Sequence, residues 1–288
     1  MNSTLSATIS SNGLNYIPCS MVEPNTDNRC SNPEDANWAA PGVYFNWAWN
    51  ASMLGAAVTG PDGQSIADWI DNTLSYGFGR LTGLLPANTF GGYPGEGFYS
   101  TAYNGAYGAW GLASNNYRDE GILSLEFLIN NDQAGPYAWW EGSTAPGTSP
   151  WIGNHPASGG GASPHSWGIA MGDLGLLDSL VSQATDGTLV VGRGVPNSWV
   201  KPGSPIAVSN FPTIDGHRIG VAITTRGDAV TLKVTGSLSG PVVFELPAFV
   251  NNIASASAGT VDNAAGSVTV SAHTQSVTVV LAHAPAAS

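Results

Sequence analysis

Glu141 directly follows two tryptophans, Trp139 and Trp140, in a segment, GPYAWWE, that is too rich in Gly and Pro to be a helix. A carboxylate flanked by aromatic rings suits carbohydrate chemistry, because the rings stack on the apolar faces of a sugar and their low dielectric tunes the acid. Such a carboxylate can activate water or protonate a leaving group. A structural alternative stays open, in which the two tryptophans fill a core and Glu141 caps the next segment.

The segment that follows, SPWIGNHPASGGGASPHSWG, adds Trp151, His155, His165 and Trp167. Its glycines allow the backbone to approach a ligand closely, so the pattern favours a substrate-binding site over core packing. The two histidines are expected to hydrogen-bond sugar hydroxyls as neutral imidazoles. A zinc site built on them is the weaker interpretation, because the sequence has no third ligand at a suitable spacing and no HExxH motif. No metal and no cofactor is predicted.

Two earlier loops contain carboxylates that would complete an acid and base pair. NPEDANW carries Asp35 before Trp38, and GGYPGEGFYSTAYN carries Glu96 before Tyr103. Asp35 and Glu96 are candidate catalytic acids; the alternatives are a helix N-cap for Asp35 and a solvent-facing loop acid for Glu96. Trp38 and Tyr103 are predicted to contact the substrate. An inverting pair needs carboxyls about 6.5 to 9.5 Å apart, and a retaining pair about 5 to 5.5 Å.

The elements that must position these residues differ between two parts of the chain. Up to residue 186 the sequence predicts about six helices joined by long, aromatic-rich loops. The clearest helical segments are 37–58, 65–78, 100–112, 118–130 and 164–181. They contain many glycines, each of which costs about 1 kcal/mol relative to alanine, so tight mutual packing must stabilise them.

After residue 186 the sequence changes to seven short β-branched stretches separated by Gly, Pro, Asn or Asp, from TLVVGRGVP at residue 188 to SVTVVLAH at residue 276. Seven strands at this spacing predict an antiparallel β-sandwich of about 100 residues. The fold class is therefore α+β multidomain, with a helical domain over 1–186 and a sandwich over 187–288. No carboxylate cluster or aromatic cage accompanies the strands, which favours a stabilising module, with carbohydrate binding as the alternative.

Composition limits the classes of partner. The net charge is -12 with only eight Lys and Arg residues, which argues against nucleic acid and against membrane surfaces, since both are bound through Lys and Arg. The acidic charge also ranks neutral or cationic glycans above strongly anionic ones. No apolar run approaches the roughly 18 residues of a transmembrane helix, and the first residues lack the pattern of a signal peptide. Low charge with 37 Gly and 19 Pro is nonetheless typical of an exported protein, so a secreted or cell-surface location is expected.

Cys19 and Cys30 enclose the polar loop CSMVEPNTDNRC. In an oxidising compartment the two residues would form a disulfide, and two unrelated thiols are the alternative. A metal site is not predicted there, because no His or third Cys lies near the pair.

The order of these features resembles the C-terminal portion of the six-hairpin (α/α)-barrel glycosidases, the group that includes inverting α-L-rhamnosidases, glucoamylases and trehalases. The matching features are an aromatic-rich loop with WWE, a Gly-rich stretch, a helix that begins at PHSWG and a terminal sandwich. Together they are most similar to the rhamnosidase-like branch. The resemblance implies a partial barrel of about three helical hairpins followed by the sandwich.

The resemblance also implies an inverting hydrolysis of a glycosidic bond, with Glu141 as general base and with Trp139, Trp140 and Trp151 lining the sugar subsite. In these families the general acid lies in an earlier loop, and this chain has room for only three of the six hairpins. We therefore expect the second half of a catalytic domain, whose acid comes from this chain or from the missing N-terminal half of the barrel as a partner. Other classes that stay open are a sugar-binding protein without a complete acid and base pair, and a structural protein.

Overall fold

The computed structural model describes most of the chain from residue 116 onward and short stretches before it. The described residues are 7, 10–11, 13, 71–72, 74–75, 92–93, 98–100, 108–109, 111–114, 116–131, 133–135, 138–144, 159–160, 162–184 and 186–284. The chain divides into two compact units, residues 1–176 and 177–288, with the division inside a helix. The predicted boundary after residue 186 lies later in the chain, because a strand that precedes it pairs within the sandwich.

Two helices of the first unit have described bounds, α7 (Arg118–Asn131) and α8 (Ser166–Leu180), and the last residues of α8 belong to the second unit. They confirm the helices predicted over 118–130 and 164–181. The predicted helices 65–78 and 100–112 each contain described helical residues, whereas 37–58 lies outside the described residues. These described helices do not show a partial barrel.

Glycines bring the helical segments of the first unit into close contact, as their glycine content predicts. A Cβ added to Gly121 of α7 would lie 2.6 Å from the backbone nitrogen of Leu112 and 2.8 Å from the carbonyl carbon of Gly111. A Cβ added to Gly175 of α8 would collide with the side chain of Leu125. The absence of side chains at these positions therefore allows the backbones to approach, which offsets the low helix propensity of glycine.

Short strands of the first unit form two small antiparallel sheets. The larger sheet has the order β1-β2-β5-β6, and its strands are β1 (Gly92–Tyr93), β2 (Phe98–Ser100), β5 (Gly142–Thr144) and β6 (Gly159–Gly160). The smaller sheet is a hairpin of β3 (Gln133–Gly135) and β4 (Ala138–Trp139). The sequence predicts loops in these segments, because strands of two or three residues are too short to show an alternating pattern.

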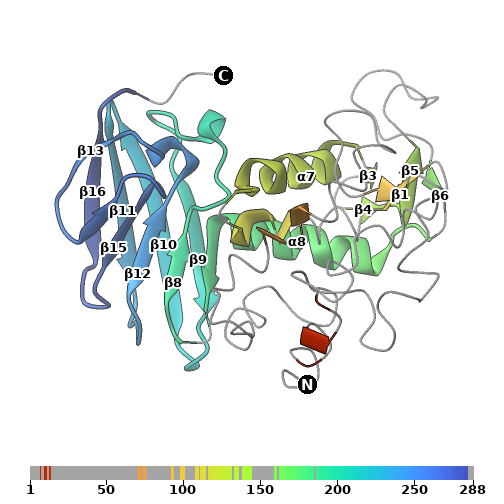
Figure 1. Cartoon of the computed structure of the whole chain (residues 1–288), viewed down its shortest axis with the longest axis horizontal. Coiled ribbons are helices and arrows are strands. Elements are labelled where there is room, and N and C mark those ends of the chain that lie inside the picture. The colour runs from red at the N-terminus through yellow and green to blue at the C-terminus, as the bar shows by residue number, and fades with distance from the viewer. Residues whose placement is uncertain are drawn as a thin grey trace. The chain divides into compact units, whose positions relative to one another are not determined.

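The second unit is a β-sandwich of two five-stranded sheets (Figure 1). One sheet has the order β13-β16-β11-β10-β9 and is fully antiparallel; its strands are β9 (Ile206–Pro212), β10 (Arg218–Arg226), β11 (Ala229–Thr235), β13 (Ile253–Ala256) and β16 (Ser276–Leu281). The other sheet has the order β14-β15-β12-β8-β7; its strands are β7 (Val181–Gln183), β8 (Leu189–Val191), β12 (Val242–Glu245), β14 (Thr260–Asp262) and β15 (Ser267–Val270). Two 3₁₀ turns, η3 (Asn197–Trp199) and η4 (Pro247–Phe249), lie between strands.

The sandwich confirms the seven strands predicted from alternation and adds β7, β13 and β14, each at a sheet edge. These three strands lack the signal that identifies the others: every residue of β14, for example, is exposed. One pair also departs from the antiparallel prediction, since β8 and β12 are parallel, with Leu189 opposite Val242.

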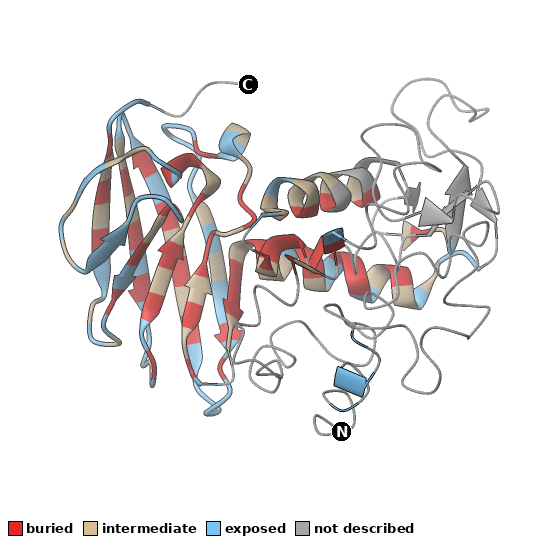
Figure 2. Ribbon diagram, in the orientation of Figure 1, coloured by how far each residue is buried: buried red, intermediate tan, exposed pale blue. Residues whose placement is uncertain are grey.

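The two sheets share one hydrophobic core, as the burial pattern in Figure 2 shows. Along β10 and β11, buried Val, Ile and Leu side chains alternate with more exposed ones, so one face of this sheet packs against the other sheet. Phe244 of β12 and Phe249 are fully buried and meet edge to face, with ring centroids 4.9 Å apart. Burial of this kind stabilises by about 1.5 to 3 kcal/mol per large apolar side chain.

Asp178, on the part of α8 that belongs to the second unit, is a half-buried carboxylate near Arg193. Burial raises the pKa of Asp178 above its ordinary value of 3.8, and the positive charge of Arg193 opposes that increase. A raised folded-state pKa means that the folded protein binds this proton more tightly than the unfolded chain does. The resulting stabilisation is complete below pH 3.8 and is lost as the pH rises through the raised pKa.

We therefore expect the free energy of unfolding of the wild type, relative to Asp178→Asn, to decrease as the pH rises from about 3 to about 7. Asparagine has a similar shape and no ionisation, so it removes only the pH-dependent contribution. Urea unfolding of both proteins across this pH range measures the difference. A difference that stays constant or grows in favour of the wild type contradicts the expected burial effect.

Candidate functional site

The candidate site lies where the chain leaves hairpin β3–β4 and meets the segment before α8. The backbone N–H of Glu141 donates to the carbonyl of Ala162 (3.0 Å), and the N–H of Ala162 donates to Oε2 of Glu141 (3.0 Å). Two residues earlier, the carbonyl of Trp139 accepts from the N–H of His165 (2.9 Å). The structure thus brings together the WWE and PHSWG motifs, although Glu141 and Ala162 are 21 positions apart in the sequence.

Trp139 anchors this arrangement from the inside. Its side chain is 7% exposed, and its indole N–H donates to the carbonyl of Leu128 in α7 (3.1 Å). The same ring packs beside Gly172 of α8, where an added Cβ would lie 3.6 Å from Cζ2 of the indole. The geometry of Trp139 therefore fits the core alternative, and its contacts with α7 and α8 anchor the start of the segment that carries Trp140 and Glu141.

The carboxylate of Glu141 is exposed and oriented at the same time. Its Oε2 is fixed by the N–H of Ala162, and no other described residue hydrogen-bonds to its Oε1. Glu141 directly precedes β5, which pairs with β2 on one side and β6 on the other. A carboxylate with one oxygen held by backbone can accept a proton from a water molecule at its other oxygen.

His165 is the N-cap of α8. Its Nδ1 accepts from the N–H of Gly168 (3.2 Å), and its carbonyl accepts from the N–H of Ile169 (3.0 Å). Because Nδ1 is an acceptor, a neutral imidazole here carries its proton on Nε2, which makes that atom a donor. The ring of Trp167 lies beside it, with centroids 6.0 Å apart. The sequence predicts the neutral imidazole but not this capping role.

Loss of the cap is expected to destabilise the protein. His165→Ala should lower the free energy of unfolding by about 1 kcal/mol, whereas His165→Asn, which keeps a capping acceptor, should lie closer to the wild type. Guanidinium unfolding followed by tryptophan fluorescence measures both variants. If His165→Ala and His165→Asn lower the free energy of unfolding equally, the hydrogen bond from the N–H of Gly168 does not stabilise the helix.

The remaining predicted site residues lie outside the described residues: Asp35, Trp38, Glu96, Tyr103, Trp151 and His155, together with the cysteines Cys19 and Cys30. The described sheet nevertheless links two of the predicted loops. β2 begins two residues after Glu96 and pairs with β5, with Ser100 opposite Gly142, the residue after Glu141. The strands that follow the Glu96 and Glu141 loops thus belong to one sheet.

One buried carboxylate was not singled out from the sequence. Asp71 is 8% exposed; its Oδ1 accepts from the backbone N–H of Asn116 (3.3 Å) and its Oδ2 from the side-chain amide of Asn116. These bonds connect a helical residue of an earlier segment to the chain just before α7. No local sequence pattern indicates this contact, because Asp71 and Asn116 are 45 positions apart.

Neither a metal site nor a membrane span is found within the part of the chain that the structure describes. No group of three or more His, Cys, Asp or Glu side chains there is arranged to hold a metal ion. No described helix combines the length and the apolar character needed to cross a membrane.

The sequence matches no protein-family model and no curated protein. Among solved structures, the chain is similar to an α-L-rhamnosidase of Streptomyces avermitilis, determined in complex with L-rhamnose. The TM-score is 0.36 and the sequence identity 14%. The alignment covers 84% of this chain but 26% of that enzyme, so the chain spans only a small part of the enzyme's length.

Proposed function

We propose that this chain acts on carbohydrates as a glycoside hydrolase, with Glu141 as the general base of an inverting hydrolysis. The observation that carries the proposal is the exposed carboxylate of Glu141, which the N–H of Ala162 orients. The backbone of the same segment bonds to the stretch before α8, through Glu141 to Ala162 and through Trp139 to His165. The WWE and PHSWG motifs of the resemblance to six-hairpin glycosidases meet at this point.

In the proposed reaction, Oε1 of Glu141 accepts a proton from water while the water oxygen bonds to the anomeric carbon. The glycosidic carbon–oxygen bond breaks, and the general acid donates a proton to the leaving oxygen. We assign that acid to Asp35 or Glu96, or to a barrel half outside this chain. Trp140 would stack on the sugar, and Nε2 of His165 would donate to a hydroxyl. Low charge and high Gly and Pro content support our placing the protein outside the cell or on its surface.

A second candidate is a carbohydrate-binding protein without turnover. It is favoured by the composition of the described surroundings of Glu141, where Trp140, His165 and Trp167 supply aromatic rings and a hydrogen-bond donor. These groups are sufficient for sugar binding without a second carboxylate. The two candidates share the site and differ in whether a bond is broken.

Sugar release from a panel of aryl glycosides and plant or microbial polysaccharides tests the proposal, with the full chain and Glu141→Gln assayed in parallel. Release by the wild type and not by the variant supports hydrolysis at Glu141. A folded wild type that releases nothing, but changes its tryptophan fluorescence with the same saccharides, supports the binding protein instead. If the folded wild type shows no turnover and no fluorescence response, both candidates are contradicted.

A further inference from the structure

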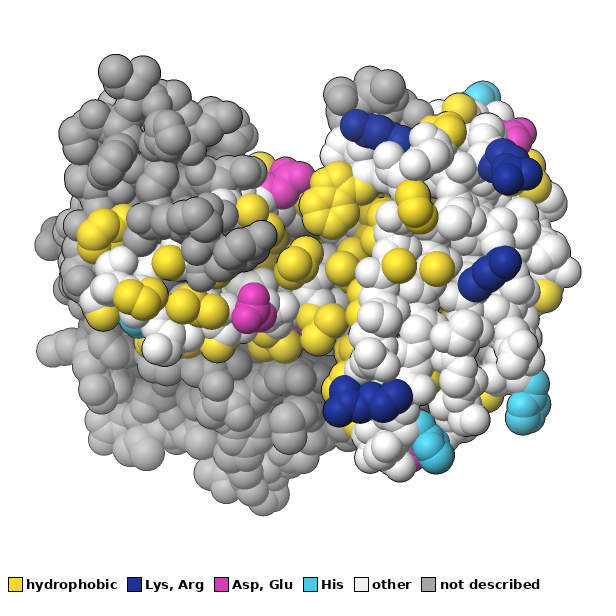
Figure 3. All heavy atoms as spheres, turned by 180° about the vertical axis from the view of Figure 1, so that it is seen from behind, with side chains coloured by type: hydrophobic (Ala, Val, Ile, Leu, Met, Phe, Trp, Pro, Cys, Tyr) yellow, Lys and Arg dark blue, Asp and Glu magenta, His cyan; other side chains and the backbone are white. Residues whose placement is uncertain are grey.

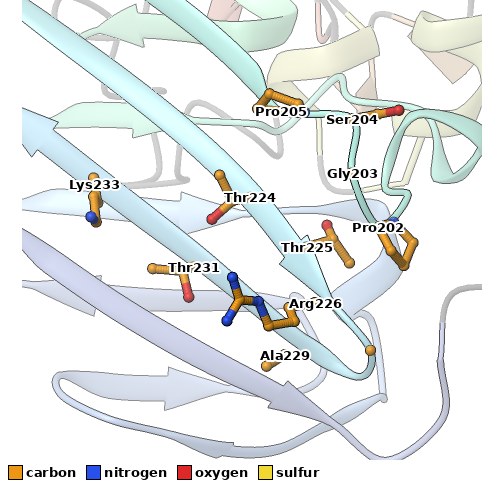
Figure 4. A pocket seen from close by; sticks show the side chains of 11 residues that line it. Pro202, Gly203, Ser204, Pro205, Thr224, Thr225, Arg226, Ala229, Thr231 and Lys233 are labelled. Atoms are coloured by element: carbon orange, nitrogen blue, oxygen red, sulfur yellow. The ribbon is translucent and has the colours of Figure 1, made fainter.

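The sandwich contains a groove of about 680 Å³ beside β10 and β11 (Figure 4). Strand residues Thr224 and Arg226 of β10 and Thr231 and Lys233 of β11 line one side, and the loop 202–205 lines the other. An isolated parallel β-bridge pairs Pro202 with Thr225 and holds the loop against the end of β10. The groove therefore has walls fixed by secondary structure, and all of it belongs to the second unit.

A row of threonines crosses the sheet, and two of its members, Thr224 and Thr231, line the groove. Thr224 of β10 is directly opposite Thr231 of β11, and Thr231 is directly opposite Thr278 of β16. The hydroxyls of Thr231 and Thr278 are 2.9 Å apart and hydrogen-bonded. Thr224 is exposed, so the row offers hydroxyl groups that can both donate and accept.

Two cations flank the threonines along the strands. Arg226 is opposite Ala229, and Lys233 lies four residues further along β11, which at about 3.4 Å per residue separates the Cα atoms of Ala229 and Lys233 by about 14 Å. Both cationic side chains are exposed, and neither has an ion pair or hydrogen bond to another described residue. Among the described residues, no carboxylate lines the groove; Asp228, in the turn between β10 and β11, lies outside its walls.

The second unit, residues 177–288, is much less acidic than the net charge of the whole chain suggests. Residues 177–288 contain five of the eight Lys and Arg residues but only six of the twenty Asp and Glu residues, which gives a formal charge of -1. Figure 3 shows separate Lys and Arg side chains on a sandwich surface that is otherwise largely uncharged. The ranking of neutral or cationic glycans over anionic ones, drawn from the net charge of -12, therefore does not apply to this groove.

We propose that the groove binds a carboxylate-bearing glycan, of the chemical class of uronic acid oligosaccharides. Arg226 and Lys233 pair with carboxylates through charge-assisted hydrogen bonds, and Thr224 and Thr231 bind the hydroxyls between them. Pro202 and Pro205 give the loop wall an apolar surface for sugar rings. The Cα atoms of Ala229, which is opposite Arg226, and of Lys233 are about 14 Å apart, which exceeds one sugar ring, so the site suits an oligosaccharide. This binding is independent of hydrolysis at Glu141.

An acidic peptide fits the groove less well. Peptides that bind sheets commonly add a strand at an edge, where backbone groups are unpaired. Here β10 lies between β9 and β11, and β11 lies between β10 and β16, so neither strand offers an unpaired edge. Recognition has to come from side chains, which matches a ligand rich in hydroxyl and carboxylate groups.

Calorimetric titration of the full chain carrying Glu141→Gln, a substitution chosen to slow any hydrolysis at the proposed base, tests the proposal. The probes are a short oligogalacturonide, its methyl ester, which keeps the sugar skeleton without the charge, and a polyglutamate peptide. We expect the oligogalacturonide to bind, and the methyl ester to bind at least about tenfold more weakly. Equal binding of acid and ester, or binding of polyglutamate with no binding of the oligogalacturonide, overturns the proposal.

Variants assign the binding to the groove. Arg226→Gln and Lys233→Gln should each weaken binding of the oligogalacturonide about tenfold, because each removes one charge-assisted contact at an exposed site. Arg218→Gln is the matched control: it removes a cation from the same strand β10, but Arg218 donates to the carbonyl of Asn210 (2.8 Å) and does not line the groove. Equal affinities for the wild type, Arg226→Gln and Lys233→Gln would overturn the assignment.

Discussion

Glu141→Gln is expected to lower kcat/KM for glycoside hydrolysis by about 10²- to 10⁴-fold, the usual contribution of a positioned general base. The glutamine carbonyl can still accept the hydrogen bond that the N–H of Ala162 donates to Oε2 of Glu141. The side chain therefore keeps its place, but it cannot take a proton from water. Initial rates on an aryl glycoside that the wild type cleaves, with circular dichroism of both proteins, provide the measurement.

The matched control is Glu126→Gln, because Glu126 is a half-buried glutamate of α7 in the same unit and lies outside the candidate site. It removes the same charge and should leave kcat/KM within about twofold of the wild type. Glu141→Asp keeps a carboxylate but shortens the side chain, so its rate should fall between those of the wild type and the glutamine variant. If Glu141→Gln stays within a few-fold of the wild type and folds normally, Glu141 is not the base.

The sandwich could be predicted from the sequence because its central strands carry a strong physical signal. In β10 and β11, one face is buried and the other is not, so apolar and polar residues alternate. Edge strands such as β14, which bury no side chain, leave no such pattern. The parallel pairing of β8 with β12 was also beyond prediction, since alternation identifies a strand but not the neighbour with which it pairs.

The candidate site was predicted as a set of residues rather than as a geometry. The motifs WWE and PHSWG were identified, and the structure joins them through Glu141, Ala162 and His165. Because Trp139 and Trp140 are adjacent in the sequence, the pattern does not indicate which of them is buried in the core. That choice depends on Gly172 and on the carbonyl of Leu128, which belong to two helices distant from each other in the sequence.

The close packing of glycines leads to the second large effect. Gly121→Ala is expected to lower the free energy of unfolding by about 2 to 3 kcal/mol, although alanine has the higher helix propensity by about 1 kcal/mol. The added Cβ would lie within 3.0 Å of three backbone atoms, from Leu112, Gly111 and Gly108, and these atoms cannot rotate away. Overpacking against backbone therefore outweighs the gain in propensity.

Gly175→Ala separates this effect from a general response of helical glycines. Its Cβ would meet the side chain of Leu125, which can change rotamer, so the loss should be about 1 kcal/mol or less. Nine of the ten tryptophans precede residue 168, so fluorescence during urea unfolding reports on the first unit. A Gly121→Ala protein as stable as the wild type would show that the backbones of α7 and of the segment around Gly111 are not in contact, and that propensity alone determines the stability of these helices.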